Sequence, residues 1–209
     1  WPIIRFIPDG ILATFQVTVL SIVFALILGL LTGLGRISRI KLISRIATVY
    51  VEVIRGIPLL VQLFYIYYAL GRFVKVPDMV AAVVAMSVCY GAYMGEVFRA
   101  GIESIDKGQT EAARSLGMSS AQAMRHVILP QAVRVVLPPI GNEFIALLKD
   151  SSLVSVVAVV DLTRRGREFM SSTFMPLPTW IMVALLYLVM TLLSSVVVGW
   201  VEKKTRIER

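Results

Sequence analysis

Apolar residues gather in five stretches of about 20 residues, and most polar and charged residues fall in the segments between them. A helix rises 1.5 Å per residue, so each stretch is long enough to cross the roughly 30 Å hydrocarbon core of a bilayer. The pattern predicts an all-α polytopic membrane protein that forms a single transmembrane domain over residues 1–209. The five predicted spans are residues 10–35, about 48–70, about 78–100, about 131–160 and 178–201.

Composition agrees with a lipid environment. Apolar residues make up 57% of the chain and charged residues only 16%, whereas about 25% of residues are charged in soluble domains. The net charge of +8 would indicate a nucleic-acid partner in a soluble protein, but in a membrane protein it reflects basic cytoplasmic loops. A single cysteine, Cys89, and a single histidine, His126, exclude an intrachain disulfide and a cysteine or multi-histidine metal site.

The distribution of lysine and arginine predicts the orientation in the membrane. Thirteen of them lie in residues 36–45, 99–134 and 203–209, on one side of the predicted spans, and six lie on the other side. Because basic residues accumulate in cytoplasmic loops, the N-terminus is expected outside and the C-terminus in the cytoplasm. Three arginines within residues 164–167 oppose this assignment.

The longest predicted cytoplasmic segment, residues 101–131, has the pattern of two short helices joined at a glycine. Asp106 is expected to cap the first helix, and Gly117 to end it. A second helix over residues 121–128 follows a capping serine and is expected to end at Pro130. Such a unit has the shape of a docking surface for another protein, and a solvated connector is the alternative.

Part of this segment, EAARSLGMSSAQAMRHVILPQA, resembles the EAA loop of permease subunits of ATP-binding-cassette (ABC) importers. The runs VEVIRGIPLLVQLF, FRAGIESIDKGQTEAARSLG and LPPIGNEFIALLKDSSLVS resemble the polar amino acid branch of that family. In the family, this loop forms coupling helices that sit in a groove of an ATPase subunit. The residues that this resemblance places at the ATPase contact are Glu111, Ala112, Ala113 and Gly117, with Arg114 at the rim of the contact.

The resemblance also implies the partners and the location of the chain. It implies a five-helix permease in the bacterial inner membrane that works as a pair of subunits, identical or different. It further implies two cytoplasmic ATPase subunits and an extracytoplasmic substrate-binding protein. Since the chain has no GxxxxGK[ST] phosphate-binding loop, ATP is expected on the partner. We therefore expect a transport subunit with no cofactor and no catalytic residue, rather than an enzyme.

Two pairs of opposite charges lie at similar depth inside predicted spans. Glu52 and Arg55 are three residues apart near the inner end of the second span, as are Glu96 and Arg99 in the third. Ionisable residues near the bilayer centre cost about 2.5–3.5 kcal/mol each on insertion scales. Either each pair closes on its own helix, or the pairs cross between neighbouring spans. We favour a structural ion-pair lock over contact with the solute.

Glu143 is the main candidate for contact with a transported solute. It lies 12 residues beyond Gln131, about 18 Å into the fourth span, and no opposite charge stands three or four residues away. The prolines and glycine of 138–141 and the polar run 149–152 are expected to break this span, and broken helices supply binding sites in transporters. Glu143 is therefore predicted to contact a cationic group, and pairing with Lys149 or an arginine is the alternative.

Other side chains are weaker candidates for solute contact. Asp161 would supply a second carboxylate at the outer end of the fourth span, and the two carboxylates favour a cationic side chain such as that of arginine, lysine or histidine. The remaining candidates for solute contact are Ser151, Ser152, Ser155, Tyr90 and Met94. Packing between helices is an equally good explanation for these small and apolar side chains.

The sequence thus predicts the permease subunit of an ATP-driven importer for polar amino acids, which forms the pathway as a dimer and works by alternating access. Two alternatives stay open. An ion-coupled secondary transporter with Glu143 as its proton carrier would transport without an ATPase. A membrane scaffold that tethers a cytoplasmic partner would tolerate the substitution Glu143→Ala.

Overall fold

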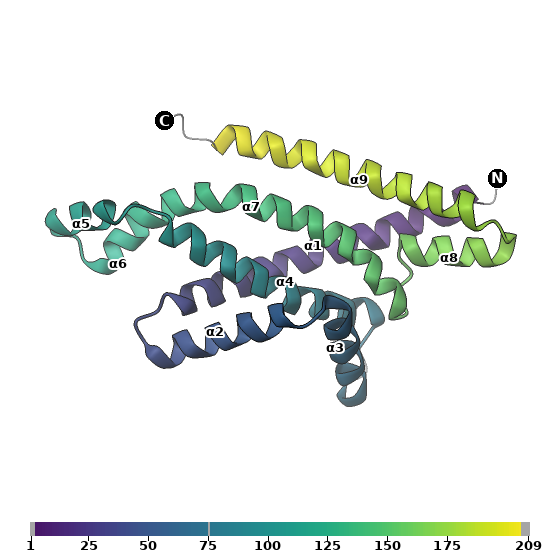
Figure 1. Cartoon of the computed structure of the whole chain (residues 1–209), viewed down its shortest axis with the longest axis horizontal. Helices are drawn as coiled ribbons and strands as arrows, with labels where there is room; N and C mark the ends of the chain where they lie inside the picture. The colour runs from purple at the N-terminus through teal and green to yellow at the C-terminus, as the bar shows by residue number, and fades with distance from the viewer. Residues whose placement is uncertain (1–2, 75, 206–209) are drawn as a thin grey trace.

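The computed structural model describes residues 3–74 and 76–205, which form helices joined by short turns (Figure 1). The long helices lie lengthwise along the molecule, and α3 stands across them. In chain order the elements are α1 (Ile3–Arg36), α2 (Lys41–Gly56), α3 (Leu59–Phe73), α4 (Asp78–Glu103), α5 (Lys107–Ser115), α6 (Ser120–Ala123), a π-helical turn (Met124–Ile128), α7 (Leu129–Asp150), a 3-10 turn (Ser151–Val156), α8 (Leu162–Thr173) and α9 (Pro176–Thr205).

Three helices of the described chain are long and apolar enough to cross a membrane, and they lie in α1, α4 and α9. The pair α2–α3 adds a fourth crossing if its two helices count as one span. α7 has 22 residues, a length of about 33 Å, but it carries four charged residues and is not among them. The all-helical membrane fold is confirmed, whereas the predicted count of five crossings is not.

The core of the molecule is the close packing of α1 against α4. Glycines make this approach possible, since a Cβ atom on Gly29 would overlap Met94, and one on Gly95 would overlap Thr32. Small residues let helix backbones come close in membranes, where dispersion contacts replace the hydrophobic effect as the main attraction between helices. α4 is consequently buried along much of its length, including Met86 and Met94.

The second predicted span is two helices, because α2 and α3 meet at a bend of 110°. Ile57 at the break is extended, with φ −108° and ψ 135°, which is the conformation that a following proline imposes. Pro58 also has no backbone N–H to continue the helical hydrogen bonds. The sequence predicts a kink at Pro58 within the span of residues 48–70, and the structure confirms a break at this proline, with a bend of 110° between the two helices.

The buried side chain of Gln62 holds this break together. Its Nε2 donates to the carbonyl oxygens of Ile54 and, at 2.6 Å, of Ile57. Carbonyls at a helix C-terminus have no partner within the helix, so Gln62 satisfies two acceptors that the break exposes. Its Oε1 lies 2.7 Å from Sγ of Cys89 in α4, which donates to it. Gln62 thus joins α2 and α3 to the core.

We expect Gln62→Met to destabilise the protein, because it keeps the side-chain length but leaves the Ile54 and Ile57 carbonyls without a donor. An unsatisfied buried group costs about 1–3 kcal/mol, which corresponds to a decrease in Tm of roughly 6 °C for a chain of this size. Thermal unfolding in detergent measures the change. Gln16→Met, at an exposed position of α1, is the control, and equal Tm values for the two variants would contradict this role of Gln62.

The helix that begins at α6 continues into α7 without a break. Pro130 lies in the first turn of α7 instead of ending a helix, so that prediction is wrong. The π-turn that precedes it widens the helix, which makes room for the proline ring. α7 also runs through Pro138 and Pro139, and the predicted break at 138–141 is absent. The regular helix ends only at Asp150, where the 3-10 turn begins.

The two ends of the molecule differ in charge. Figure 1 places the loop between α1 and α2, the α5–α6 segment and the end of α9 at one end, and α8 at the other. The loop at the first end, residues 36–45, carries four lysine and arginine residues and no acidic residue. At the second end, Arg164 and Arg165 pair with Glu168 at 3.3 and 3.0 Å. These contacts partly offset the arginine charge that the sequence places on this side.

Candidate functional site

The α5–α6 unit, residues 107–123, projects from the end of the molecule as two capped helices (Figure 1). The side chain of Asp106 accepts a hydrogen bond of 2.6 Å from the backbone of Gly108. Ser119 forms a capping box with Gln122 at the start of α6. Gly117 between the helices has φ +86°, a conformation that glycine adopts without strain. The predicted helix–glycine–helix arrangement and its first cap are confirmed.

The residues at the EAA positions lie mostly on the surface of this unit. Glu111, Ala112 and Arg114 are exposed, and Ala113 is buried against the rest of the fold. Arg114 donates to the carbonyl oxygen of Met118 at 2.9 Å, and no ion pair with Glu111 is found within residues 3–74 and 76–205. The carboxylate of Glu111 is thus available to a partner.

Leu116 extends the exposed surface of this unit beside Gly117. Its side chain is 81% exposed, which is unusual for a leucine next to polar helices. An apolar residue surrounded by charged and small ones is typical of protein contact surfaces. Sequence reasoning missed Leu116, because its apolar character alone does not distinguish an exposed tip from a buried position.

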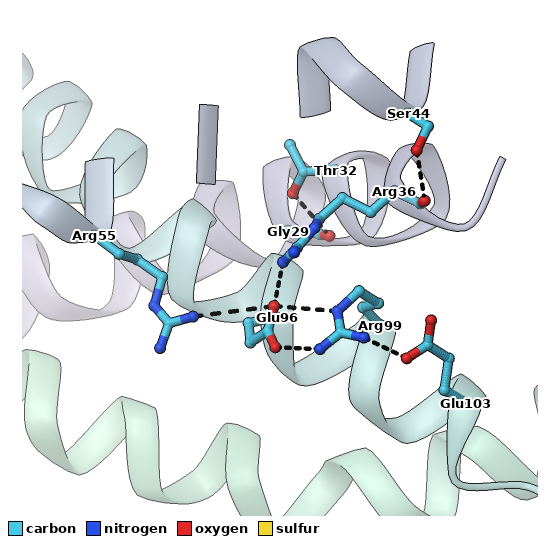
Figure 2. A network of polar contacts seen from close by, with 8 residues as sticks. All are labelled: Gly29, Thr32, Arg36, Ser44, Arg55, Glu96, Arg99 and Glu103. Atoms are coloured by element: carbon cyan, nitrogen blue, oxygen red, sulfur yellow. Dashed lines mark hydrogen bonds and ion pairs between the residues drawn. The ribbon is translucent and has the colours of Figure 1, made fainter. Parts of the chain in front are cut away.

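Glu96 of α4 is the centre of an ionic network (Figure 2). Its carboxylate pairs with Arg99 one turn away on α4 and with Arg36 at the end of α1. Arg55 of α2 lies at 4.0 Å from Oε2 of Glu96, and Arg99 reaches on to Glu103. The side chains of Glu96, Arg36 and Arg99 are at most 27% exposed. The network therefore ties three helices together at one depth.

This network differs from the predicted one in two respects. Glu52 is exposed and forms no ion pair with a described residue, so neither Glu52–Arg55 nor Glu52–Arg99 exists here. The cross-contact between Glu96 and Arg55 is present, at the long distance of 4.0 Å. Arg36 takes the place that was expected for Arg55. It lies 60 residues from Glu96 in the sequence, and no local spacing could have indicated the contact.

We expect Glu96→Gln to lower the stability of the protein, because it leaves Arg36 and Arg99 without their shared anion. Loss of charged hydrogen bonds in a partly buried site costs about 2–3 kcal/mol, which should appear as a lower Tm and a lower yield of folded protein. Glu52→Gln removes the same charge from an exposed position and should leave both quantities unchanged. Equal Tm values for the two variants would show that the network is not a structural lock.

A cavity of about 310 Å³ lies next to this network, between α2, α4 and α7. Glu143 of α7 and Arg55 of α2 both line it, together with Tyr93 and Glu96 of α4. At one end α4 and α7 are in tight contact, since a Cβ atom on Gly101 would overlap Val136. The cavity thus combines a carboxylate, a guanidinium group and an aromatic ring, as in small-molecule sites with a few placed polar groups.

Tyr90 and Met94 of the predicted solute contacts lie on α4, and neither lines this cavity. Met94 is fully buried against Gly29 of α1. Tyr90 donates a hydrogen bond of 2.7 Å to Asp150 at the end of α7. This hydrogen bond joins α4 to the C-terminal end of α7, beyond Glu143 in the same helix. Sequence reasoning did not identify Asp150 as the acceptor.

The four polar residues beyond α7 that are predicted to contact the solute lie in the 3-10 turn and at the start of α8. Asp161 is fully buried and caps α8, accepting from the backbone of Arg164 at 2.9 Å and from the Tyr187 hydroxyl at 3.3 Å. Ser151 and Ser155 are buried in the 3-10 turn, where Ser151 donates to the Leu148 carbonyl and Ser155 accepts from Arg167. Ser152 of the same turn is half-buried. None of these four side chains lines the cavity of Glu143.

Comparison with known proteins assigns the family. The family model described as "Binding-protein-dependent transport system inner membrane component" matches residues 6–207. The chain belongs to this family. It is accordingly a transport component of an ABC system rather than an enzyme, with ATP hydrolysis on a separate subunit. Membership in the family removes the support for an ion-coupled transporter or a scaffold.

Individual relatives cover nearly the whole chain. The glutamine transport system permease protein GlnP of Escherichia coli is 39% identical over 210 residues, which is 99% of this chain and 96% of that protein. The probable glutamine ABC transporter permease protein GlnM of Bacillus subtilis is 41% identical over 197 residues, or 94% and 91% of the two chains. A crystal structure of an amino acid ABC transporter with histidines superposes with a TM-score of 0.90 at 43% identity, covering 96% of this chain and 94% of that one.

Proposed function

We propose that the chain is one of two permease subunits of an ATP-driven importer for polar amino acids. One named relative is a glutamine transport system permease protein, another carries the name of a probable glutamine permease, and the similar solved structure is an amino acid transporter. The observation that carries the proposal is the unbroken helix from α6 through the π-turn to α7. It connects the exposed α5–α6 unit directly to the helix that bears Glu143 and lines the charged cavity.

The proposed orientation puts the α5–α6 unit in the cytoplasm and α8 outside. The concentration of basic residues at the α5–α6 end supports this arrangement. α1, the α2–α3 pair, α4, α7 and α9 would then be the five crossings, and the C-terminus lies in the cytoplasm. Glu111, Arg114 and Leu116 face the ATPase, and the substrate-binding protein docks at the α8 end.

In the proposed cycle, the loaded binding protein docks outside and ATP brings the two ATPase subunits together. The α5–α6 units move with the ATPases, and α7 moves with α6, so the pathway between the two permease subunits opens outward. Hydrolysis then returns it to the inward-open state. Glu143 contacts a cationic group of the solute on the way through, and a solute with a basic side chain would provide a second such group.

Reconstitution tests this proposal. The chain is co-purified with candidate ATPases, placed in proteoliposomes with a binding protein, and assayed with labelled glutamine, histidine, arginine, lysine and leucine. We expect ATP-dependent uptake of at least one polar amino acid and solute-stimulated ATP hydrolysis. Uptake driven by an ion gradient in vesicles without ATPase would contradict the proposal, as would uptake of leucine alone.

A further inference from the structure

We propose that the apolar groove between α1, α7 and α9 binds one anionic phospholipid. An acyl chain lies in the groove, and Arg134 of α7 and Lys204 of α9 bind the phosphate at its cytoplasmic end. This inference goes beyond the proposed function and takes from it only the orientation of the chain in the membrane.

The groove has a volume of about 550 Å³. It is lined mainly by aliphatic and aromatic side chains, among them Phe15 of α1, Phe144 of α7 and Leu193 of α9. Among the described residues, no ionisable side chain lines it. The hydroxyl group of Ser194, which does line it, donates to the Met190 carbonyl oxygen at 2.8 Å. This lining fits a hydrocarbon chain better than a polar solute.

α9 is largely uncovered along this groove. Leu193 and Val197 line the groove and are still 64% and 61% exposed. The part of α9 that lines it extends from Met190 to Val201, eleven residues further on. This length of about 16 Å is close to one leaflet of a hydrocarbon core roughly 30 Å thick. A single acyl chain thus matches the groove in length and in polarity.

Two basic residues lie at the same level at one end of the groove. α7 and α9 are in tight contact at Gly141, where a Cβ atom would overlap Val198. The helices run in opposite directions, since α7 starts and α9 ends at the α5–α6 end (Figure 1). Arg134 precedes Gly141 by seven residues and Lys204 follows Val198 by six, so both lie about 10 Å from the contact in the same direction. Because packed helices are about 8–10 Å apart, a phosphate between them is within reach of both side chains.

Both residues continue the helix faces that line the groove. Arg134 precedes the lining residue Leu137 by three positions, and Lys204 follows the lining residue Val201 by three; residues at this spacing share a helix face. Nζ of Lys204 lies 5.0 Å from the ring centroid of Trp200, and tryptophan is typical of the head-group level of a bilayer. Neither cation forms an ion pair with a described residue, so both are available to an anion.

The charge at this end of the groove favours a lipid over a second copy of the chain. A two-fold axis along the membrane normal would bring the basic end of the partner to the same depth. Arg134 and Lys204 would then face like charges, which is unfavourable at an interface. A phospholipid instead supplies an anion together with the chain. Two cations favour a head group that carries no positive charge of its own, such as that of phosphatidylglycerol.

Native mass spectrometry of the purified permease–ATPase complex tests the assignment. The complex is titrated with phosphatidylglycerol, with phosphatidylcholine of the same acyl chains, and with glycerol phosphate. A basic residue near an anionic head group contributes roughly a factor of five in affinity. We therefore expect phosphatidylglycerol to bind at least fivefold more tightly than phosphatidylcholine, and glycerol phosphate not to bind. Equal affinity for the two lipids would overturn the proposal, as would glycerol phosphate binding as tightly as phosphatidylglycerol.

The double variant Arg134→Gln/Lys204→Gln tests the phosphate site. Its preference for phosphatidylglycerol over phosphatidylcholine should fall to within twofold. Arg39→Gln/Arg45→Gln removes the same charge from exposed positions at the same end of the molecule and should keep the full preference. An equal loss in the two double variants would show that the lipid responds to the net charge of this end, and the assigned site would be wrong.

Val197→Trp tests the groove, because the larger side chain fills the space of the acyl chain. It should lower the affinity for both lipids at least tenfold. Val196→Trp is the matched control, since Val196 is 71% exposed and does not line the groove. Undiminished lipid binding in Val197→Trp would overturn the proposal. So would loss of the second permease subunit from this variant in the same spectra, because the groove would then be a subunit contact.

Discussion

Gly29→Leu is expected to reduce the yield of folded protein at least tenfold. A Cβ atom at this position would overlap the Met94 side chain and would lie 2.9–3.0 Å from the α4 backbone at Met94 and Gly95. A flexible side chain can move aside, but a helix backbone cannot, so α1 and α4 must separate along their shared length. Overpacking costs about 1–3 kcal/mol when side chains adjust, and separation of the two helices costs more.

Fluorescence-detected size-exclusion chromatography in mild detergent measures this effect. Gly199→Leu is the control, because nothing lies within 4 Å of a Cβ atom at that position of α9. It makes the same chemical change on a helix surface and should elute as the wild type. A monodisperse Gly29→Leu protein with the wild-type Tm would show that α1 and α4 do not need their close contact.

Gly117→Val is expected to abolish solute-stimulated ATP hydrolysis and to reduce uptake at least tenfold. Gly117 has φ +86°, and the left-handed region costs a residue with a side chain roughly 1–2 kcal/mol, more when the residue is β-branched. No atom lies within 4 Å of a Cβ atom there, so the substitution strains only the backbone between α5 and α6. The docking surface should change shape while the membrane helices stay folded.

Gly117→Asn separates this effect from a general effect of side-chain size. Asparagine tolerates the left-handed region better than most residues, so this variant should keep most of the uptake. ATP hydrolysis and uptake are measured in the same proteoliposomes, and Tm reports folding. Normal coupling in Gly117→Val would show that the angle between α5 and α6 does not control the ATPase contact.

Uninterrupted apolar runs made most of the fold predictable. The spans predicted over 10–35, 78–100 and 178–201 all lie inside single helices. In the α2–α3 segment Pro58 predicts a kink, but neither the proline nor the average hydropathy indicates that the bend reaches 110°. α7 shows the opposite error, since Pro138 and Pro139 predict a break but the helix continues through both of them to Asp150.

In the candidate site, contacts between residues close in the sequence were predictable, and contacts between distant residues were not. Glu96 and Arg99, three residues apart, pair as their spacing predicts, but Arg36 comes from 60 residues away. The sequence predicts Asp161 as a second carboxylate for solute contact, whereas its hydrogen bonds to the start of α8 are those of a helix cap. Local spacing identifies caps and i, i+3 pairs. It does not identify which helices the fold brings side by side.

The continuous helix from Ser120 to Asp150 determines how far Glu143 moves when the α6 end of the helix tilts. Glu143 lies 23 residues beyond Ser120, about 35 Å along the axis at 1.5 Å per residue. A tilt of about 5° around the α6 end would displace Glu143 by about 3 Å, by the geometry of a rod of this length. A rotation of a few degrees would thus move Glu143 by about the length of a hydrogen bond relative to the α2 and α4 walls of its cavity.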